Sequence, residues 1–289
     1  MTELTETGLG PSLTDNFQSM KRRLSLTLFS LWLIVLSAGC QRSGDGITVA
    51  GSTSVEPFAE LLAEEYMHEH SGTHIYVQGG GSTAGIEAVK THTANIGMSS
   101  RALVGGEKNL HTITIAKDAI VIIVHRKNPI DDLSLIDIRR VFSGNTRSWK
   151  ELGGAAAPIT LVTREEGSGT REAFQKFVMG KDEISLESLV QDSNGAVRQV
   201  VASNPGAIGY LSLGLVNDQV KALRVAGVEP NLTEIQKGTY TLVRPFLFVF
   251  NQEPEGEARS FVEFVLSLGP QRLLQKEGLV PVFSGLDKE

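Results

Sequence analysis

The chain has 289 residues, of which 41% are hydrophobic and 21% are charged, with 30 Gly and 10 Pro. This composition is typical of an ordinary globular protein, and the length favours two domains over a single core. The formal net charge of −6 argues against nucleic acid as a partner, and the single cysteine excludes both an internal disulfide and a cysteine-based metal cluster.

The first predicted element is a secretory signal over residues 1–39, with Met20 as a candidate true start. A basic patch precedes an apolar run from Leu24 to Val35, which is short for a membrane span, and small residues then lead to Cys40. This segment resembles the lipobox of bacterial lipoproteins. The resemblance implies export across the cytoplasmic membrane and lipidation of Cys40 at a periplasmic or cell-surface location. The alternative is an incidental cysteine in an uncleaved anchor.

Strand and helix signals alternate after a short tether at residues 40–46. Runs rich in β-branched residues predict strands at residues 47–51, 74–78, 95–99, 112–125, 159–164, 207–213 and 240–250. Helical hydrophobic spacing predicts helices from residue 55, at residues 83–93, 135–144, 170–180 and 194–204, and beyond residue 254. This alternation is typical of α/β units with a parallel sheet.

Two long strands, at residues 112–125 and 240–250, connect the two α/β halves. We therefore predict a bilobed protein with a cleft. Lobe 1 is expected to comprise residues 47–121 and 222–289, and lobe 2 residues 122–221.

A turn rich in glycine and hydroxyl residues precedes a predicted helix three times, in "AGSTSV", "GGGSTA" and "GSGT". A helix start leaves several backbone N–H groups unpaired and carries partial positive charge, and Ser or Thr hydroxyls can donate further hydrogen bonds. Three such starts around a cleft could enclose a tetrahedral oxyanion, and Arg164 would add a planar guanidinium. For any one turn, simple helix capping is the stronger interpretation. The coincidence of three glycine-bearing turns favours a ligand.

Five motifs in order, "GSTSVEP", "VQGGGSTAGI", "IGMSSR", "REEGSGTREAF" and "NPGAIGYLSL", resemble those of bacterial phosphate-binding proteins that serve phosphate ABC importers. The resemblance covers nearly all of residues 47–283. It implies a periplasmic-binding-protein type II fold, with two α/β lobes joined by a two-strand hinge. It further implies inorganic phosphate as ligand, and the permease and ATPase subunits of an ABC importer as partners. We expect a monomer.

The same resemblance suggests the site residues. The first turn would contact phosphate through Thr53 and Ser54, and the second through Ser82. The third turn would contribute Arg164, Ser168, Gly169 and Thr170, with Glu166 where an acidic residue often braces the arginine.

One position departs from the family pattern. Some members have Asp in the turn that matches "GMSSR", where it accepts the proton of bound phosphate. This chain has Ser100 instead, which we also expect to contact phosphate. Asp118, polar within an apolar strand, is the candidate replacement. The alternative is that Asp118 is a hinge-strand residue that faces solvent.

Enzymes are a less favoured class. The turns lack the lysine of a nucleotide-binding P-loop and the second glycine of a Gly-x-Ser-x-Gly elbow, so we expect no catalytic residue and no cofactor. Two other receptor functions stay open. One is a receptor for sulfate or molybdate. The other is a zinc receptor using the histidines of "HEHSGTH", although solvated histidines at a helix end are favoured there and we expect no metal.

Overall fold

The computed structural model describes residues 46–283. Cys40 and the predicted signal lie outside this range. The strands are β1 Gly46–Gly51, β2 His74–Gly79, β3 Ile96–Ser99, β4 His111–His125, β5 Asp132–Leu133, β6 Thr160–Arg164, β7 Leu189–Gln191, β8 Ala207–Ser212, β9 Val220–Ala222, β10 Arg224–Val225, β11 Val243–Phe250 and β12 Val280–Pro281. The helices are α2 Glu56–Glu69, α3 Ser82–Lys90, α4 Leu135–Phe142, α5 Gly169–Phe174, α6 Asn194–Ser203, α7 Leu232–Gln236, α8 Gly256–Val265 and α9 Leu268–Lys276. Each predicted strand and helix downstream of residue 46 is confirmed within a few residues.

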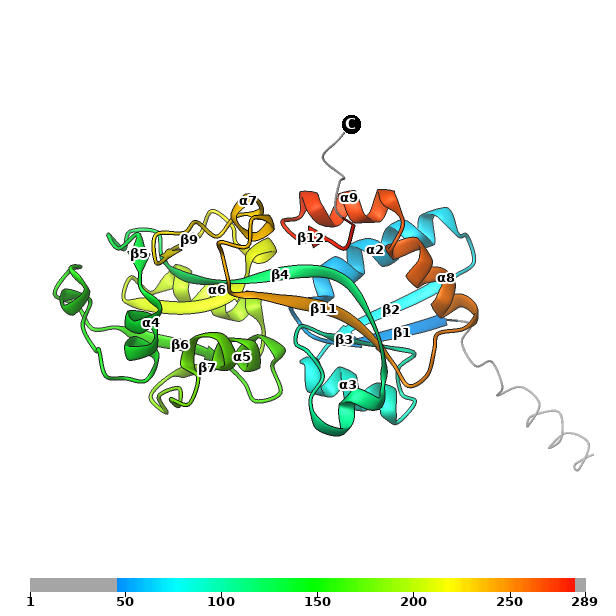
Figure 1. Ribbon diagram of the computed structural model, residues 1–289, viewed down its shortest axis with the longest axis horizontal. Coiled ribbons are helices and arrows are strands. Elements are labelled where there is room, and N and C mark those ends of the chain that lie inside the picture. Colours follow the sequence, from blue (N-terminus) through cyan, green and yellow to red (C-terminus); the bar gives the residue numbers. More distant parts are fainter. Residues whose placement is uncertain (1–45, 284–289) are drawn as a thin grey trace, which may run out of the picture. The chain divides into compact units, whose positions relative to one another are not determined.

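The long strand β4 is shared by two groups of elements (Figure 1). Residues 111–119 of β4 pair antiparallel with β11, which continues through β3 and β1 to β2. Residues 120–124 of β4 pair antiparallel with β8, which continues through β6 to β7. Neighbours are parallel within each outer set, β1 with β2 and β3, and β6 with β7 and β8. The two α/β halves therefore meet on β4 and β11, as the pair of long strands predicted.

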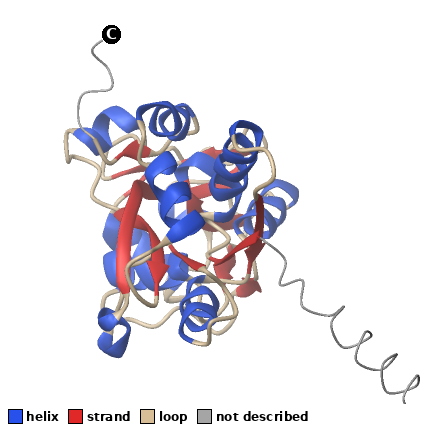
Figure 2. Ribbon diagram, turned by 90° about the vertical axis from the view of Figure 1, so that its right-hand side faces the viewer, coloured by secondary structure: helices blue, strands red, loops and turns tan. Residues whose placement is uncertain are grey.

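Successive side chains of β11 pack on opposite faces of the sheet, and helices lie on both sides of the strands (Figure 2). In β11, Phe246, Phe248 and Phe250 pack in the cluster that includes α2, α8 and α9 residues, whereas Leu247 and Val249 pack with Ile86 of α3. Successive residues of a strand point to opposite faces, so a strand buried on both faces reads as a continuous apolar run. This explains the "FLFVF" sequence of β11.

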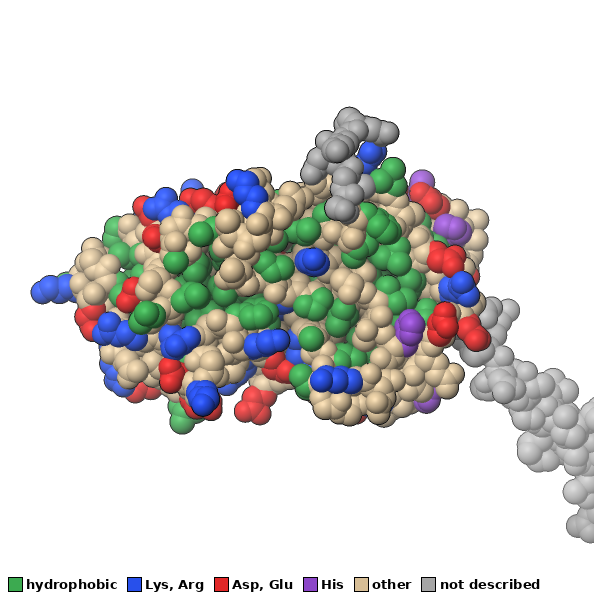
Figure 3. Space-filling model, in the orientation of Figure 1, with side chains coloured by type: hydrophobic (Ala, Val, Ile, Leu, Met, Phe, Trp, Pro, Cys, Tyr) green, Lys and Arg blue, Asp and Glu red, His purple; other side chains and the backbone are tan. Residues whose placement is uncertain are grey.

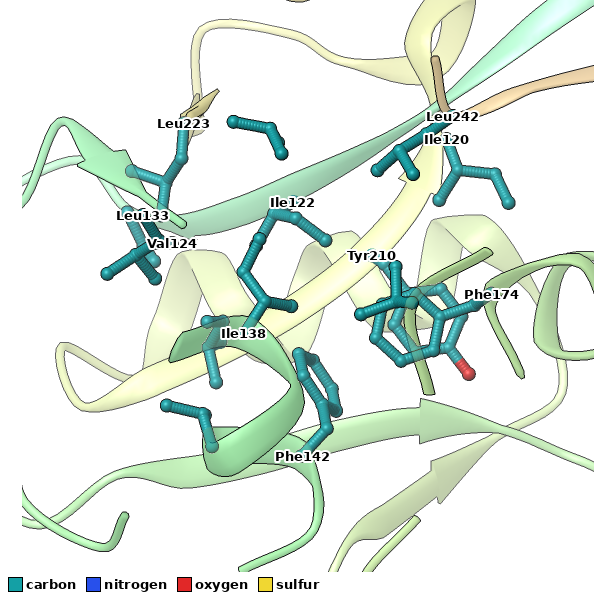
Figure 4. Packing of buried hydrophobic residues seen from close by; sticks show 14 of the residues in the cluster. Ile120, Ile122, Val124, Leu133, Ile138, Phe142, Phe174, Tyr210, Leu223 and Leu242 are labelled. Carbon is teal, nitrogen blue, oxygen red and sulfur yellow. The ribbon is translucent and has the colours of Figure 1, made fainter. Parts of the chain in front are cut away.

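A second cluster fills the other group, where Phe174 and Tyr210 stack at 3.9 Å between ring centroids (Figure 4). Ile120, Ile122 and Val124 of β4 face this cluster. The segment after β9 also packs here, through Leu223, Val225, Ile235, Tyr240 and Leu242. The packing therefore favours a return to the first group at Val243, about twenty residues after the boundary predicted at residue 222. Sequence periodicity is weak between these residues and gave no sign of their partners.

Candidate functional site

The three glycine-hydroxyl turns, which follow β1, β2 and β6, lie next to one another. The turn after β3 lies beside them. Backbone hydrogen bonds connect them in sequence: Gly80 N donates to Gly51 O at 2.8 Å, Ser52 N to Met98 O at 3.0 Å, and Thr83 N to Gly167 O at 3.1 Å. The last of these bonds runs between the two groups of elements. The structure thus brings together segments that are more than 100 residues apart in the chain.

The hydroxyls of these turns form two buried hydrogen-bonded sets. In one, Ser52 Oγ donates to Ser100 Oγ at 2.8 Å, and Ser82 Oγ lies 3.3 Å from Ser100 Oγ. In the other, Ser54 Oγ and Thr170 Oγ1 lie 2.7 Å apart. Ser82, Ser100, Ser54 and Thr170, all predicted to contact the ligand, therefore lie in these sets.

Helix capping does not explain the first two turns. The N-cap residues of α2 and α3 are Val55 and Gly81, and neither helix has a side-chain capping bond. Only Ser168, the N-cap of α5, uses its hydroxyl this way, accepting from Arg171 N at 3.3 Å. Two of the three hydroxyl-rich turns are therefore available for a role other than capping.

Gly169 is required by the close approach of the third turn to the second. A Cβ atom at this position would collide with Ser82 Oγ and lie 2.6 Å from Ser100 Oγ. Glycine alone permits this approach without displacing those hydroxyls.

Arg164, the last residue of β6, is buried with only 1% of its surface exposed. Its Nη2 donates to Thr53 Oγ1 at 3.0 Å and to Asp192 O at 3.0 Å, and its Nε donates to Gln191 O at 3.2 Å. Its Nη1 is buried and has no hydrogen-bond partner in the described part of the chain. Buried donors of folded proteins are nearly always paired, so this nitrogen is available for an anion.

Glu165, rather than Glu166, braces Arg164. The Glu165 carboxylate accepts from Arg164 Nε and Nη2, both at 2.8 Å. Glu166 is exposed. The bracing role predicted for Glu166 therefore belongs to Glu165. The chain turns directly after β6, so the side chain of Glu166 is exposed.

Asp118 lies in the interior and does not face solvent. Its carboxylate accepts from Ser212 Oγ at 2.7 Å and from Arg244 Nε at 2.9 Å, and Arg244 is the residue directly opposite on β11. Burial raises the pKa of the Asp118 carboxyl, and Arg244 opposes that shift. Both carboxylate oxygens already accept from protein donors, so the structure pairs Asp118 with Arg244 and does not place it as the acceptor of the phosphate proton that the sequence suggested.

Sequence reasoning missed Arg244 and Asn194. Arg244 donates to Thr170 Oγ1 at 2.8 Å and to Ser54 Oγ at 3.1 Å, and Asn194 Nδ2 donates to Ser54 Oγ at 2.9 Å. The sequence did contain one indication for Arg244, which is the single charged residue in the apolar run "VRPFLFVF". The structure shows that this run pairs with the strand of Asp118. Asn194 begins α6 and looks like an ordinary helix-start residue.

Arg101, directly after Ser100, links the two groups of elements. It forms ion pairs with Glu107 at 2.7 Å and with Glu172 of α5 at 2.7 Å, and its Nη2 donates to Thr83 Oγ1 at 3.3 Å. The hydrogen bond from Arg101 holds the pKa of Glu107 below its usual range. Glu172 and Arg101 therefore add an ionic contact beside the hydroxyl sets.

The three histidines of "HEHSGTH" do not converge on a metal site. His70 stacks on Tyr66 at 4.0 Å, and His74 stacks on Tyr76 at 6.5 Å. Residues 46–283 contain no group of three or more His, Cys, Asp or Glu that could hold a metal ion. No helix in this range is long and apolar enough to cross a membrane.

Comparison with known proteins identifies the family. The PBP superfamily domain matches residues 37–268. The phosphate-binding protein PstS of Bacillus subtilis is 30% identical over 91% of this chain and 95% of its own length. The chain belongs to the PstS family of phosphate-binding proteins. The predicted type II binding-protein fold is thereby confirmed.

Solved relatives extend the similarity to PstS proteins. A substrate-binding protein of a phosphate ABC transporter from Clostridium perfringens, solved with bound phosphate, is 40% identical. It aligns with a TM-score of 0.80 over 82% of this chain and 100% of its own. An ABC-type phosphate transport receptor from Vibrio cholerae is 36% identical, with a TM-score of 0.68 over 81% of this chain and 99% of its own.

Proposed function

We propose that this chain binds inorganic phosphate outside the cytoplasmic membrane and delivers it to the permease and ATPase subunits of an ABC importer. The observation that carries the proposal is Arg164. Its Nη1 is a buried donor with no hydrogen-bond partner among residues 46–283, and its Nη2 donates to Thr53 in the first of the converging turns. The relative from Clostridium perfringens was solved with phosphate. The protein acts as a receptor and carries out no covalent chemistry.

The proposed ligand contacts come from the four converging turns. They are Thr53, Ser82, Ser100, Arg164, Ser168, Gly169 and Thr170, whereas the predicted contact Ser54 lies behind Thr170, with its Oγ 2.7 Å from Thr170 Oγ1. Arg164 supplies donors only, and a hydroxyl can turn its proton toward an oxygen of the ligand, which suits an anion with four oxygens. We further propose that two lobes close on the anion. The hinge would lie where β4 and β11 run from one group of elements to the other.

Equilibrium binding to protein starting at Gln41 tests this function. Calorimetric titrations with phosphate, arsenate, sulfate, molybdate and Zn²⁺ should give tight binding for phosphate and for arsenate, its closest analogue in shape and charge. Preferred binding of sulfate or molybdate would support the other oxyanion receptors, and binding of Zn²⁺ alone would support a metal receptor. Figure 3 shows acidic and basic side chains mixed over one face of the molecule.

Lipidation of Cys40 is the proposed anchor, and it lies outside the described residues. Several acyl chains hold a protein at a membrane much more firmly than one. Cys40→Ala should change processing and lower the amount of lipid-modified, membrane-bound protein. An unchanged mass and unchanged membrane fractionation would contradict the anchor.

A further inference from the structure

Arg244 contacts two hydroxyls that belong to different turns of the site. Its Nη1 donates to Thr170 Oγ1 at 2.8 Å, and its Nη2 donates to Ser54 Oγ at 3.1 Å. Asp118 pairs with the same guanidinium, at 2.9 Å from both Nε and Nη2. Only 2% of the Arg244 surface is exposed. The guanidinium is thus buried, paired with a carboxylate and fixed against two hydroxyls of the converging turns.

These contacts determine the proton direction of Ser54. A guanidinium has donors and no acceptor, so Ser54 Oγ accepts from Arg244. It also accepts from Asn194 Nδ2 at 2.9 Å, and the orientation of that amide follows from its Oδ1, which accepts from Ser212 N at 3.4 Å. Two N–H donors occupy both lone pairs of the hydroxyl. Ser54 must therefore donate its own proton, and Thr170 Oγ1 lies 2.7 Å away.

The hydroxyl of Thr170 is constrained in the same way. Its Oγ1 accepts from Arg244 and from Ser54, so its lone pairs are also occupied. Its proton must point to a third group, and Thr170 has no third hydrogen-bond partner within residues 46–283. A hydroxyl in this state can only donate. At Thr170 the site therefore presents a donor to an oxygen that has a free lone pair.

We propose that Arg244, with Asn194, is a positioning residue that forces Thr170 to donate its hydroxyl proton to an unprotonated oxygen of bound phosphate. This inference rests on the proposed function. Arg244 acts through Thr170 and does not itself touch the anion, and Asp118 keeps it charged and in place. The protonated oxygen of phosphate must then lie elsewhere in the site.

A double-mutant cycle on the full chain, purified in detergent, tests this coupling by phosphate titration. Thr170→Val removes the hydroxyl at nearly constant volume and should weaken phosphate binding about 10- to 100-fold, whereas Thr170→Ser should restore most of it. Arg244→Lys keeps the charge for Asp118 but loses the fork that holds two hydroxyls, and should weaken binding about 10-fold.

Coupling is the decisive outcome, because residues that act through one another are not additive. In the Thr170→Val background, Arg244→Lys should weaken binding less than about 3-fold. An equal loss in both backgrounds, or no loss in the unmodified background, overturns the inference. Asn194→Ala provides a second cycle with the same expectation should Arg244→Lys not fold. Absence of phosphate binding by the unmodified protein overturns the proposed function as well, so the two failures are distinguishable.

Discussion

Glu165 holds the guanidinium of Arg164, its neighbour in the chain, through two hydrogen bonds of 2.8 Å. The Arg164 side chain is 1% exposed and that of Glu165 is 27% exposed, so water screens this pair only in part. A bidentate pair fixes the plane of the guanidinium as well as its position. The direction in which Nη1 of Arg164 points thus depends on Glu165.

Adjacent glutamates offer a matched test of this brace. Glu165→Gln and Glu166→Gln each remove one negative charge. Any increase in anion affinity caused by the lost charge alone should therefore be the same in both variants. Only Glu165→Gln loosens Arg164, and we expect it to bind phosphate about 5- to 10-fold more weakly than Glu166→Gln, as measured by calorimetry. Equal affinities in the two variants would show that the brace does not matter for binding.

Arg164 itself should supply the main positive charge of the site. Charge-assisted hydrogen bonds contribute roughly 1.5–3 kcal/mol each, so Arg164→Ala should weaken phosphate binding by a factor on the order of 10² or more. Arg164→Lys should recover part of the loss, because an ammonium cannot reproduce the planar fork. Arg147→Ala, which changes an exposed arginine, is the control and should bind normally. A near-normal phosphate affinity of Arg164→Ala would show that Arg164 has only a structural role.

Asp118→Asn should lower stability strongly. It leaves the Arg244 guanidinium buried without its counter-charge, and breaking a buried pair in this way costs about 3–5 kcal/mol. Denaturant unfolding measures the effect. Asp131→Asn is the matched control, since it removes the carboxylate of an exposed pair with Lys221 and should change stability little. Similar stabilities for the two variants would contradict the argument.

The Arg101–Glu107 pair predicts a dependence of stability on pH. Arg101 lowers the pKa of Glu107 in the folded state, so the unfolded carboxyl takes up its proton first as the pH falls. The stabilisation is present above the unfolded value of about 4.3 and is lost as the pH falls through the folded pKa. Melting temperatures of Glu107→Gln should lie below those of the unmodified protein at pH 7, and the difference should shrink as the pH is lowered below the unfolded pKa. A difference that stays constant as the pH falls would contradict this assignment.

Closure of the lobes should be visible in solution. Thr83 donates to Gly167, and Arg101 pairs with Glu172, across the two groups of elements. Such contacts form only when the groups approach, and an anion bound between them favours that arrangement. Small-angle scattering should give a smaller radius of gyration with saturating phosphate than without it. Identical curves would count against closure.

Local features of the site were predictable from sequence, and relations between distant residues were not. The three turns could be found because glycine and hydroxyl residues cluster directly before helical spacing. The partnership of Asp118 with Arg244 depends on the register of two strands whose residues are 126 positions apart. Nothing in one sequence fixes that register. Similarly, whether Glu165 or Glu166 faces Arg164 depends on the path of the chain after β6.

β4 has a consequence for how the protein loses its structure. Its residues 111–119 hydrogen-bond within one half, and residues 120–124 within the other. Ile115 packs in the first hydrophobic cluster, and Ile122 packs in the second. Unfolding of either half disrupts β4, and the other half loses hydrogen bonds and packing when β4 is disrupted. Unfolding of residues 46–283 is therefore expected to be cooperative across both halves. The two halves, which we propose to close on phosphate, would then denature together. Phosphate bound between them would therefore protect helices as remote as α8.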